Sequence, residues 1–171
     1  APPAPGWGGR YWILVKVTTD TGIVGWGECY ASSIGPQAMQ AVIQDVFERH
    51  MHDENPENIE LMYRRVYSSG FTQRPDLTVM GAFSGLEIAC WDILGKHRER
   101  PVYALMGGQM NERVRGYTYL YPLAHHDKTA FWTSPEMAAE SALDYVDRGY
   151  TAIKFDPAGP YTLRGGHMPA M

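Results

Sequence analysis

Lys154 and Asp156 have the residue types and the spacing of a pair that could bind an anion or move a proton. The surrounding residues 150–156 are rich in β-branched and aromatic side chains, which predicts a strand whose side chains alternate between two faces. Ile153 and Phe155 would share one face, and Lys154 and Asp156 would project together from the other. This arrangement suits either a buried ion pair that holds strands in register or a carboxylate-binding, proton-transferring pair. The spacing alone leaves both interpretations open.

Three histidine-bearing segments and one loop offer further chemistry. Residues 50–53 (His-Met-His-Asp) could suggest a metal site, but their place after an apolar helical stripe predicts a solvated helix end. Residues 125–127 (His-His-Asp) fit no motif and are predicted to be exposed in a loop. His167 follows two glycines and belongs either to an active-site loop or to a free chain end. The loop 71–76, with aromatic, amide and guanidinium groups, serves either recognition or simple connection.

Composition and missing motifs narrow the function classes. The 171 residues carry 19 acidic and 15 basic side chains, a net charge of −4, without the basic cluster that a nucleic acid or an anionic membrane attracts. No GxxxxGK[ST], GxSxG, HExxH or paired CxxC motif occurs, which argues against common nucleotide-binding, serine-hydrolase and zinc sites. No apolar run approaches the roughly 20 residues of a membrane span. From the charge pattern we expect no nucleic-acid or membrane partner, and because two cysteines cannot form a disulfide framework we expect a cytoplasmic protein.

The first part of the chain predicts a hairpin followed by helices. Residues 11–19 and 23–28 read as strands around the turn Asp20-Thr21-Gly22, and the two glycines within the second strand indicate close approach by another element. Pro36 and residues 55–57 mark two helix starts. A third, very apolar helix is predicted over residues 79–96, with small residues that would let another helix approach and an ion pair between Asp92 and Lys96.

The second part predicts a single β-α-β unit. Residues 114–121 form a candidate strand, Ser134-Pro135 starts a helix that ends at Gly149, and the strand at 150–156 follows. A long helical connection implies that the two strands are parallel, and parallel sheets need both faces covered. One such unit cannot cover both faces, so we expect this chain to be the front part of a longer protein.

Several segments resemble a known family. Residues 82–96, which include Ala89-Cys-Trp-Asp-Ile-Leu-Gly-Lys96, and residues 101–107 are similar to the signature of the mandelate racemase/muconate lactonizing enzyme group of the enolase superfamily. Residues 25–28 resemble that group's strand motif. The resemblance implies an α+β capping domain over residues 1–110, with a three-stranded antiparallel sheet plus helices. Residues 111–171 would be the first strands of a modified TIM (β/α) barrel, which is incomplete here.

The segment Lys154-Phe-Asp156 departs from the family in an informative way. Members of this group often carry Lys-x-Lys on the second barrel strand, with the second lysine as a base. Lys154 matches the first lysine, which typically contacts the substrate carboxylate, whereas Asp156 replaces the base. This difference weakens the racemase and cycloisomerase interpretations and favours the sugar-acid dehydratases, to which residues 154–161 and 164–167 are most similar.

The resemblance implies a Mg²⁺-dependent hydro-lyase that removes the proton α to a carboxylate, forms an enediolate and expels the β-hydroxyl. Lys154 and Asp156 would be catalytic, and Tyr30, Arg74 and His167 would contact a small sugar-acid substrate in a homo-oligomer. The metal ligands of the family lie on later strands, so no metal ligand is named here, and the 171-residue chain alone is expected to be inactive. The alternatives are a racemase or cycloisomerase of the same superfamily, or a non-catalytic capping-domain fragment that only binds or oligomerises.

Overall fold

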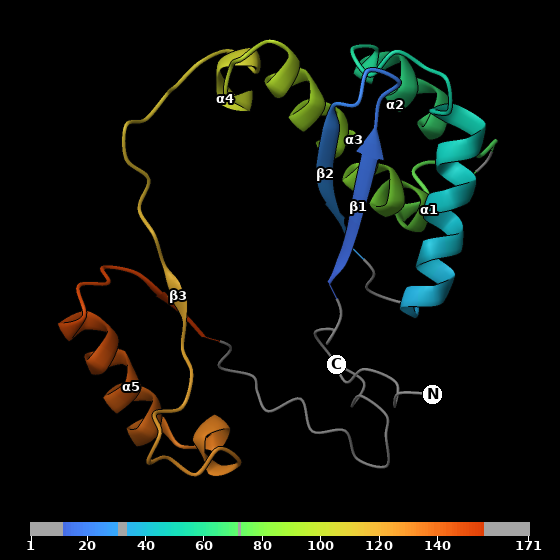
Figure 1. The fold of residues 1–171 in the computed structure, drawn as a ribbon. Helices are drawn as coiled ribbons and strands as arrows, with labels where there is room; N and C mark the ends of the chain where they lie inside the picture. Colours follow the sequence, from blue (N-terminus) through green and yellow to red (C-terminus); the bar gives the residue numbers. More distant parts are fainter. Residues whose placement is uncertain (1–11, 31–33, 72, 156–171) are drawn as a thin grey trace. The chain divides into compact units, whose positions relative to one another are not determined.

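A computed structural model describes residues 12–30, 34–71 and 73–155 of the chain (Figure 1). Contacts within the chain separate it into two compact units, Ala1–Gln109 and Met110–Met171. The sequence places the domain boundary one residue later, after residue 110. The two units are described separately below.

The first unit begins with the predicted hairpin. Strands β1 (Ile13–Thr18) and β2 (Val24–Cys29) pair antiparallel, with Ile13 opposite Cys29 and Thr18 opposite Val24. The turn closes at Gly22, whose φ of +86° favours glycine. The hairpin prediction is confirmed. The sheet has two strands within the described residues, and the third strand that the resemblance implies is not among them.

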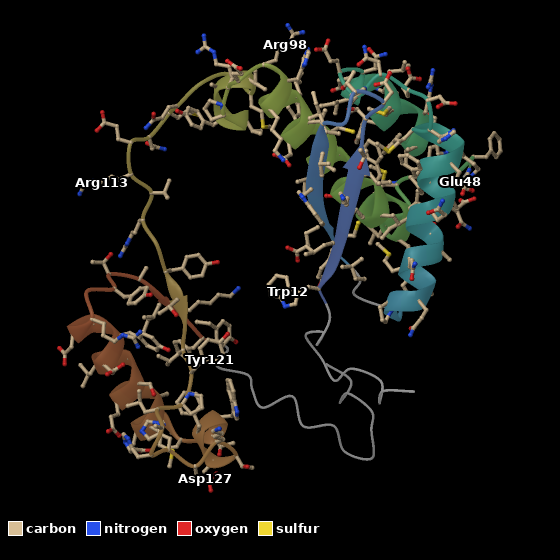
Figure 2. All side chains as sticks on the ribbon, viewed as in Figure 1. Trp12, Glu48, Arg98, Arg113, Tyr121 and Asp127 are labelled. Carbon is tan, nitrogen blue, oxygen red and sulfur yellow. The ribbon has the colours of Figure 1, made fainter. Side chains whose placement is uncertain are left out.

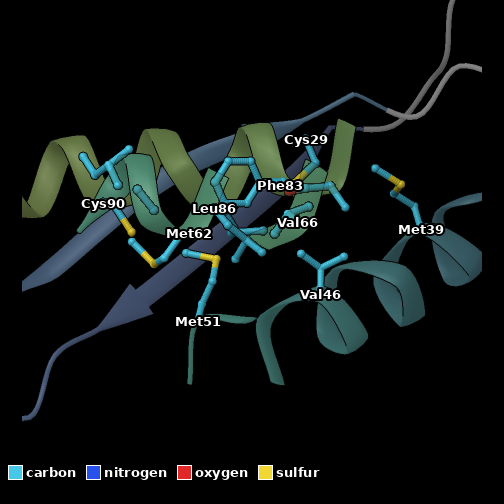
Figure 3. Packing of buried hydrophobic residues seen from close by; sticks show 13 residues of the cluster. Cys29, Met39, Val46, Met51, Met62, Val66, Phe83, Leu86 and Cys90 are labelled. Atoms are coloured by element: carbon cyan, nitrogen blue, oxygen red, sulfur yellow. Dashed lines mark hydrogen bonds between the residues drawn. The ribbon is translucent and has the colours of Figure 1, made fainter. Parts of the chain in front are cut away.

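Helix α3 (Leu77–His97) is the centre of the first unit and packs on both strands and on helices α1 (Pro36–His50) and α2 (Ile59–Ser68) (Figure 1). It starts two residues earlier than predicted because the Asp76 side chain accepts hydrogen bonds from the backbone N–H groups of Thr78 and Val79. Its buried face joins residues of the other elements in one apolar core (Figure 3). The largest fully buried apolar side chains are Phe83, Met39, Met62, Val46, Val66 and Cys90.

Small residues of α3 accommodate β2, and α3 also packs on the helices α1 and α2. A Cβ added at Gly27 would lie 1.9 Å from the carbonyl oxygen of Gly85, and one added at Gly25 would lie 2.0 Å from that of Ala89. Real side-chain atoms do not approach a backbone oxygen this closely. The two strand glycines are therefore required for the contact between β2 and α3, as their position in the strand indicated.

Two residues of α3 also bind the backbone of β2. Asp92 accepts a hydrogen bond from Trp26 N–H at 2.9 Å, and Lys96 Nζ donates to the carbonyl of Val24 at 2.8 Å. The predicted ion pair between Asp92 and Lys96 is confirmed, with an N···O distance of 2.6 Å. This pair satisfies polar groups of a strand that would otherwise be exposed to pairing with another chain.

Two further expectations for the first unit were wrong. Helix α2 starts at Ile59, not at residues 55–57, because the Asn55 side chain accepts from Glu57 N–H and forms a separate turn before the helix. Helix α3 has 21 residues and is long and apolar enough to cross a membrane by length and composition. The expectation that no apolar segment approaches this length is therefore corrected. A helix that supplies core residues has the same length and composition, and α3 supplies many residues of this core. A short helix α4 (Val102–Leu105) follows it.

The second unit is the predicted β-α-β arrangement. Strands β3 (Thr118–Tyr119) and β4 (Ile153–Lys154) pair in parallel, joined through the 3₁₀ turn η1 (Ala130–Thr133) and helix α5 (Pro135–Asp147). Ser134 caps α5 by accepting from Met137 N–H, as predicted. Within the described residues these strands are shorter than predicted, and each has one hydrogen-bonded neighbour.

Candidate functional site

Lys154 lies on the face of the β3–β4 pair that also carries two tyrosines. The register sets Lys154 opposite Tyr119, and the Lys154 Nζ atom lies 5.9 Å from the centre of the Tyr119 ring. The rings of Tyr119 and Tyr121 lie 5.6 Å apart (Tyr121 is labelled in Figure 2). Leu120, between them, is only 3% exposed, so the opposite face is the covered one. Lys154 is exposed on this face, and its shared face with Asp156 stays a prediction.

This arrangement holds an exposed ammonium group beside an aromatic surface. An aromatic face attracts a cation by about 0.5–1 kcal/mol at an exposed site, which favours a particular position of the flexible lysine. Arg115 steadies the start of both strands, since its Nε donates to Thr151 Oγ1 at 2.9 Å and its Nη2 donates to the Thr151 carbonyl. A positioned ammonium group of this kind can bind a substrate carboxylate.

Two of the predicted site residues, Asp156 and His167, lie outside the described residues. The pairing of Lys154 with Asp156 and the role of His167 stay predictions. Sequence reasoning did not single out Tyr119 and Tyr121, although the alternation of residues 114–121 was a signal that could have found them.

Tyr30 and Arg74 both lie at the N-terminal end of α3 in the first unit. Tyr30 directly follows β2, is 77% exposed, and its carbonyl oxygen is 3.0 Å from the position of a Cβ at Gly81. Arg74 precedes the Asp76 cap, and its Nε and Nη2 donate to the carbonyl of Phe71 at 3.3 and 2.9 Å. Both side chains are exposed, and their contact with a substrate stays a prediction.

The histidine segments differ from expectation. His126 was predicted to be exposed, but its side chain is 3% exposed and stacks on Phe131, with ring centres 5.9 Å apart. It bonds Glu140 of α5, as His125 also does. In the other segment His52 is exposed, whereas His50 is half-buried, and burial lowers the pKa of its imidazole.

The described residues do not fit a Mg²⁺ ion. Among them, His125, His126 and Glu140 form the group of three close metal-binding side chains. Two of its three donors are imidazole nitrogens, whereas Mg²⁺ requires oxygen ligands in octahedral geometry. This cluster therefore does not form a Mg²⁺ site, and the position of the Mg²⁺ ligands stays a prediction.

Residues 8–107 match the N-terminal domain of the mandelate racemase / muconate lactonizing enzyme family. This match covers more than half of the sequence. The chain belongs to this family. Its α+β unit of antiparallel hairpin and helices is that family's capping domain, and the signature segments noted in the sequence lie on α3 and α4.

Solved structures support the same assignment. A mandelate racemase/muconate lactonizing enzyme from Sulfitobacter sp. is 89% identical, with a TM-score of 0.86 over 99% of this chain and 43% of the Sulfitobacter chain. A mandelate racemase/muconate lactonizing enzyme-like protein from Roseovarius sp. TM1035 is 81% identical. Its TM-score is 0.87 over 99% of this chain and 43% of the Roseovarius chain. The present chain thus spans less than half of these family members.

Curated relatives are named as dehydratases of sugar acids. A D-gluconate/D-galactonate dehydratase from Picrophilus torridus is 32% identical over 145 residues, which is 85% of this chain and 35% of that protein. A D-xylonate dehydratase from Haloferax volcanii is 36% identical over 151 residues, which is 86% of this chain and 34% of that protein. Both matches are longer than the first unit and so extend into the second.

Proposed function

We propose that this chain is the N-terminal portion of a dehydratase that acts on a sugar acid. The observation that carries the proposal is the similarity to named sugar-acid dehydratases over 85% or more of the chain, through both units. The exposed Lys154 on the tyrosine-bearing face supports it, because a sugar acid presents a carboxylate that an ammonium group can bind. Small-molecule carboxylates are therefore the proposed substrate class.

The proposed reaction removes water from the acid. A base takes the proton from the carbon next to the carboxylate, the hydroxyl on the following carbon leaves as water after it gains a proton, and the resulting enol becomes a 2-oxo-3-deoxy acid. Lys154 Nζ would bind the carboxylate and favour the negative charge that builds up on it during proton removal. Asp156 stays the proposed partner of Lys154, and Tyr30, Arg74 and His167 stay proposed substrate contacts.

The remaining expectations concern the complete protein. We propose that it requires Mg²⁺, with ligands outside the described residues, and that it is a cytoplasmic homo-oligomer.

The test compares Lys154→Ala with Lys128→Ala in the complete protein. Lys128 is an exposed lysine of the same unit and serves as the matched control. We expect the Lys154 variant to lose turnover of aldonic acids by orders of magnitude while its circular dichroism and melting are unchanged, and the Lys128 variant to stay near wild type. Near-normal turnover in the Lys154 variant would remove this residue from the mechanism.

A further inference from the structure

The loop after β3 and helix α5 meet in a cluster of His125, His126 and Glu140. The Nε2 atoms of both imidazoles lie 3.0 Å from the Glu140 carboxylate, one at each oxygen. The three candidate ligand atoms all lie within 4.8 Å of one another. His125 and Glu140 are 64% and 55% exposed at their side chains, so the cluster is open to solvent on one side.

The neighbours of the cluster fix its geometry. Asp127 is not a member, since its carboxylate accepts from the backbone N–H groups of Thr129 and Ala130. The ring of His126 is held by stacking on Phe131. Its Nδ1 atom accepts from Leu123 N–H at 3.2 Å and lies 3.5 Å from the fully buried Ser141 Oγ. These contacts keep the buried Nε2 atom of His126 beside the Glu140 carboxylate.

The donor types select the class of metal. Two imidazole nitrogens and one carboxylate are a ligand set that suits Zn²⁺, and three protein ligands leave a fourth position for water. Ligating imidazoles must give up the proton at the bound nitrogen, and they usually donate the other N–H to a fixed acceptor. For His126 that acceptor is Ser141 Oγ, and Leu123 N–H would lose its bond to Nδ1. Each neutral ring would then carry its proton on Nδ1, which leaves the Nε2 lone pairs and a Glu140 oxygen free to face the zinc ion.

We propose that His125, His126 and Glu140 form a solvent-accessible Zn²⁺ site that ties the loop after β3 to helix α5. The site is separate from Lys154 and does not rest on the proposed dehydratase activity. Tyr121 lies between β3 and this loop. Bound zinc would therefore stiffen the chain directly after the two tyrosines.

The experiment titrates Zn²⁺ into the complete protein with a competing chromophoric chelator, in excess Mg²⁺ to occupy oxygen-rich sites. His125→Ala and Glu140→Gln are the main variants, because both side chains are exposed and their loss should not unfold the unit. The matched controls are His52→Ala, an exposed histidine of the first unit, and Glu136→Gln, an exposed glutamate one turn earlier on α5. Co²⁺ in place of Zn²⁺ gives a visible spectrum that reports the ligand geometry.

We expect wild type and both controls to bind one Zn²⁺ that the two main variants bind roughly a hundredfold more weakly. Ser141→Ala should weaken zinc binding about tenfold, because the Nδ1–H of His126 would lose its acceptor. The proposal is overturned if wild type binds no more zinc than the two main variants. It is also overturned if the Co²⁺ spectrum is unchanged in His125→Ala.

Discussion

At the scale of single residues, burial decides the chemistry of the two cysteines. Cys29 and Cys90 are both free and buried within the first unit. Removal from water disfavours the thiolate and raises the pKa of each to about 11. Cys29 Sγ also donates to the carbonyl of Ala82 at 3.4 Å. These thiols pack as small apolar groups.

We predict that neither cysteine reacts with iodoacetamide at pH 8 while the protein is folded. At a pKa near 11 about one thiol in a thousand is ionised at this pH, against roughly a quarter of an unfolded thiol. Mass spectrometry before and after unfolding in urea measures the difference. Rapid labelling of the folded protein would mean that one of the sulfurs is accessible.

A second residue-scale prediction concerns Gly27. Replacement with alanine would place a Cβ 1.9 Å from the Gly85 carbonyl oxygen, so β2 and α3 must separate. We expect Gly27→Ala to lower the free energy of unfolding by about 1–3 kcal/mol or more. Urea denaturation measures this change.

The matched control is Gly116→Ala, where an added Cβ has no neighbour within 4 Å. This control should leave the urea midpoint of the first unit unchanged. Equal midpoints for Gly27→Ala and wild type would contradict the close contact between the strand and the helix.

Residue types alone did not predict the state of His126. The pair His125-His126 has no sequence pattern that separates an exposed loop from a buried ring. Its burial depends on Phe131 and Glu140, which lie several residues later and approach only when α5 has folded back. The alternation that predicts the face of Lys154 is local, but its pairing with Asp156 lies outside the described residues and stays a prediction.

At the scale of elements, α3 binds β2 through Asp92. Burial opposes ionisation of this carboxyl, but hydrogen bonds from Lys96 and Trp26 N–H outweigh it and lower its pKa. A carboxylate with a folded pKa below its unfolded value of about 3.9 contributes stability above that value. That contribution is lost as pH falls through the folded pKa.

We therefore predict that Asp92→Asn is less stable than wild type at pH 7 and that the gap narrows as the pH falls below about 4. Thermal melts from pH 7 to pH 3 test this. The control Asp53→Asn removes an exposed carboxylate that lies 3.4 Å from His52. A constant gap between Asp92→Asn and wild type across this range would show that the charge of Asp92 does not matter.

Element types were more predictable than element ends. Periodicity, Pro36 and the Ser134 cap identified the hairpin and the helices, because these signals act within one or two turns. The start of α2 was missed because Asn55 can cap a helix or close a turn, and the sequence does not distinguish the two. The partner of Gly85 was also missed, because small residues allow approach by a helix or a strand alike.

At the scale of the whole molecule, the chain is much shorter than its relatives. It spans about a third of the curated relatives that it matches. The sequence indicated such a difference in length, because one β-α-β unit cannot cover both faces of a parallel sheet. That rule cannot supply the missing strands, so the metal ligands and the base could not be predicted from these residues.

We predict that the 171-residue chain by itself neither turns over sugar acids nor binds Mg²⁺ tightly. The described residues offer a nitrogen-rich cluster where Mg²⁺ needs several oxygens. Exposed apolar side chains of the second unit, including Leu143, Val146 and Phe155, should also favour aggregation. Calorimetric titration and light scattering measure these properties, and micromolar Mg²⁺ affinity would contradict the placement of the metal site.

The central claim is that the complete protein dehydrates a sugar acid, and product analysis tests it most directly. The protein is incubated with Mg²⁺ and a panel of aldonic acids in D₂O, and the products are examined by mass spectrometry and NMR. We predict that at least one acid yields a 2-oxo-3-deoxy product that has lost one water and gained deuterium at the third carbon. Recovery of every acid intact, or of an epimer that keeps all its oxygens and carries deuterium at the second carbon, would contradict the claim.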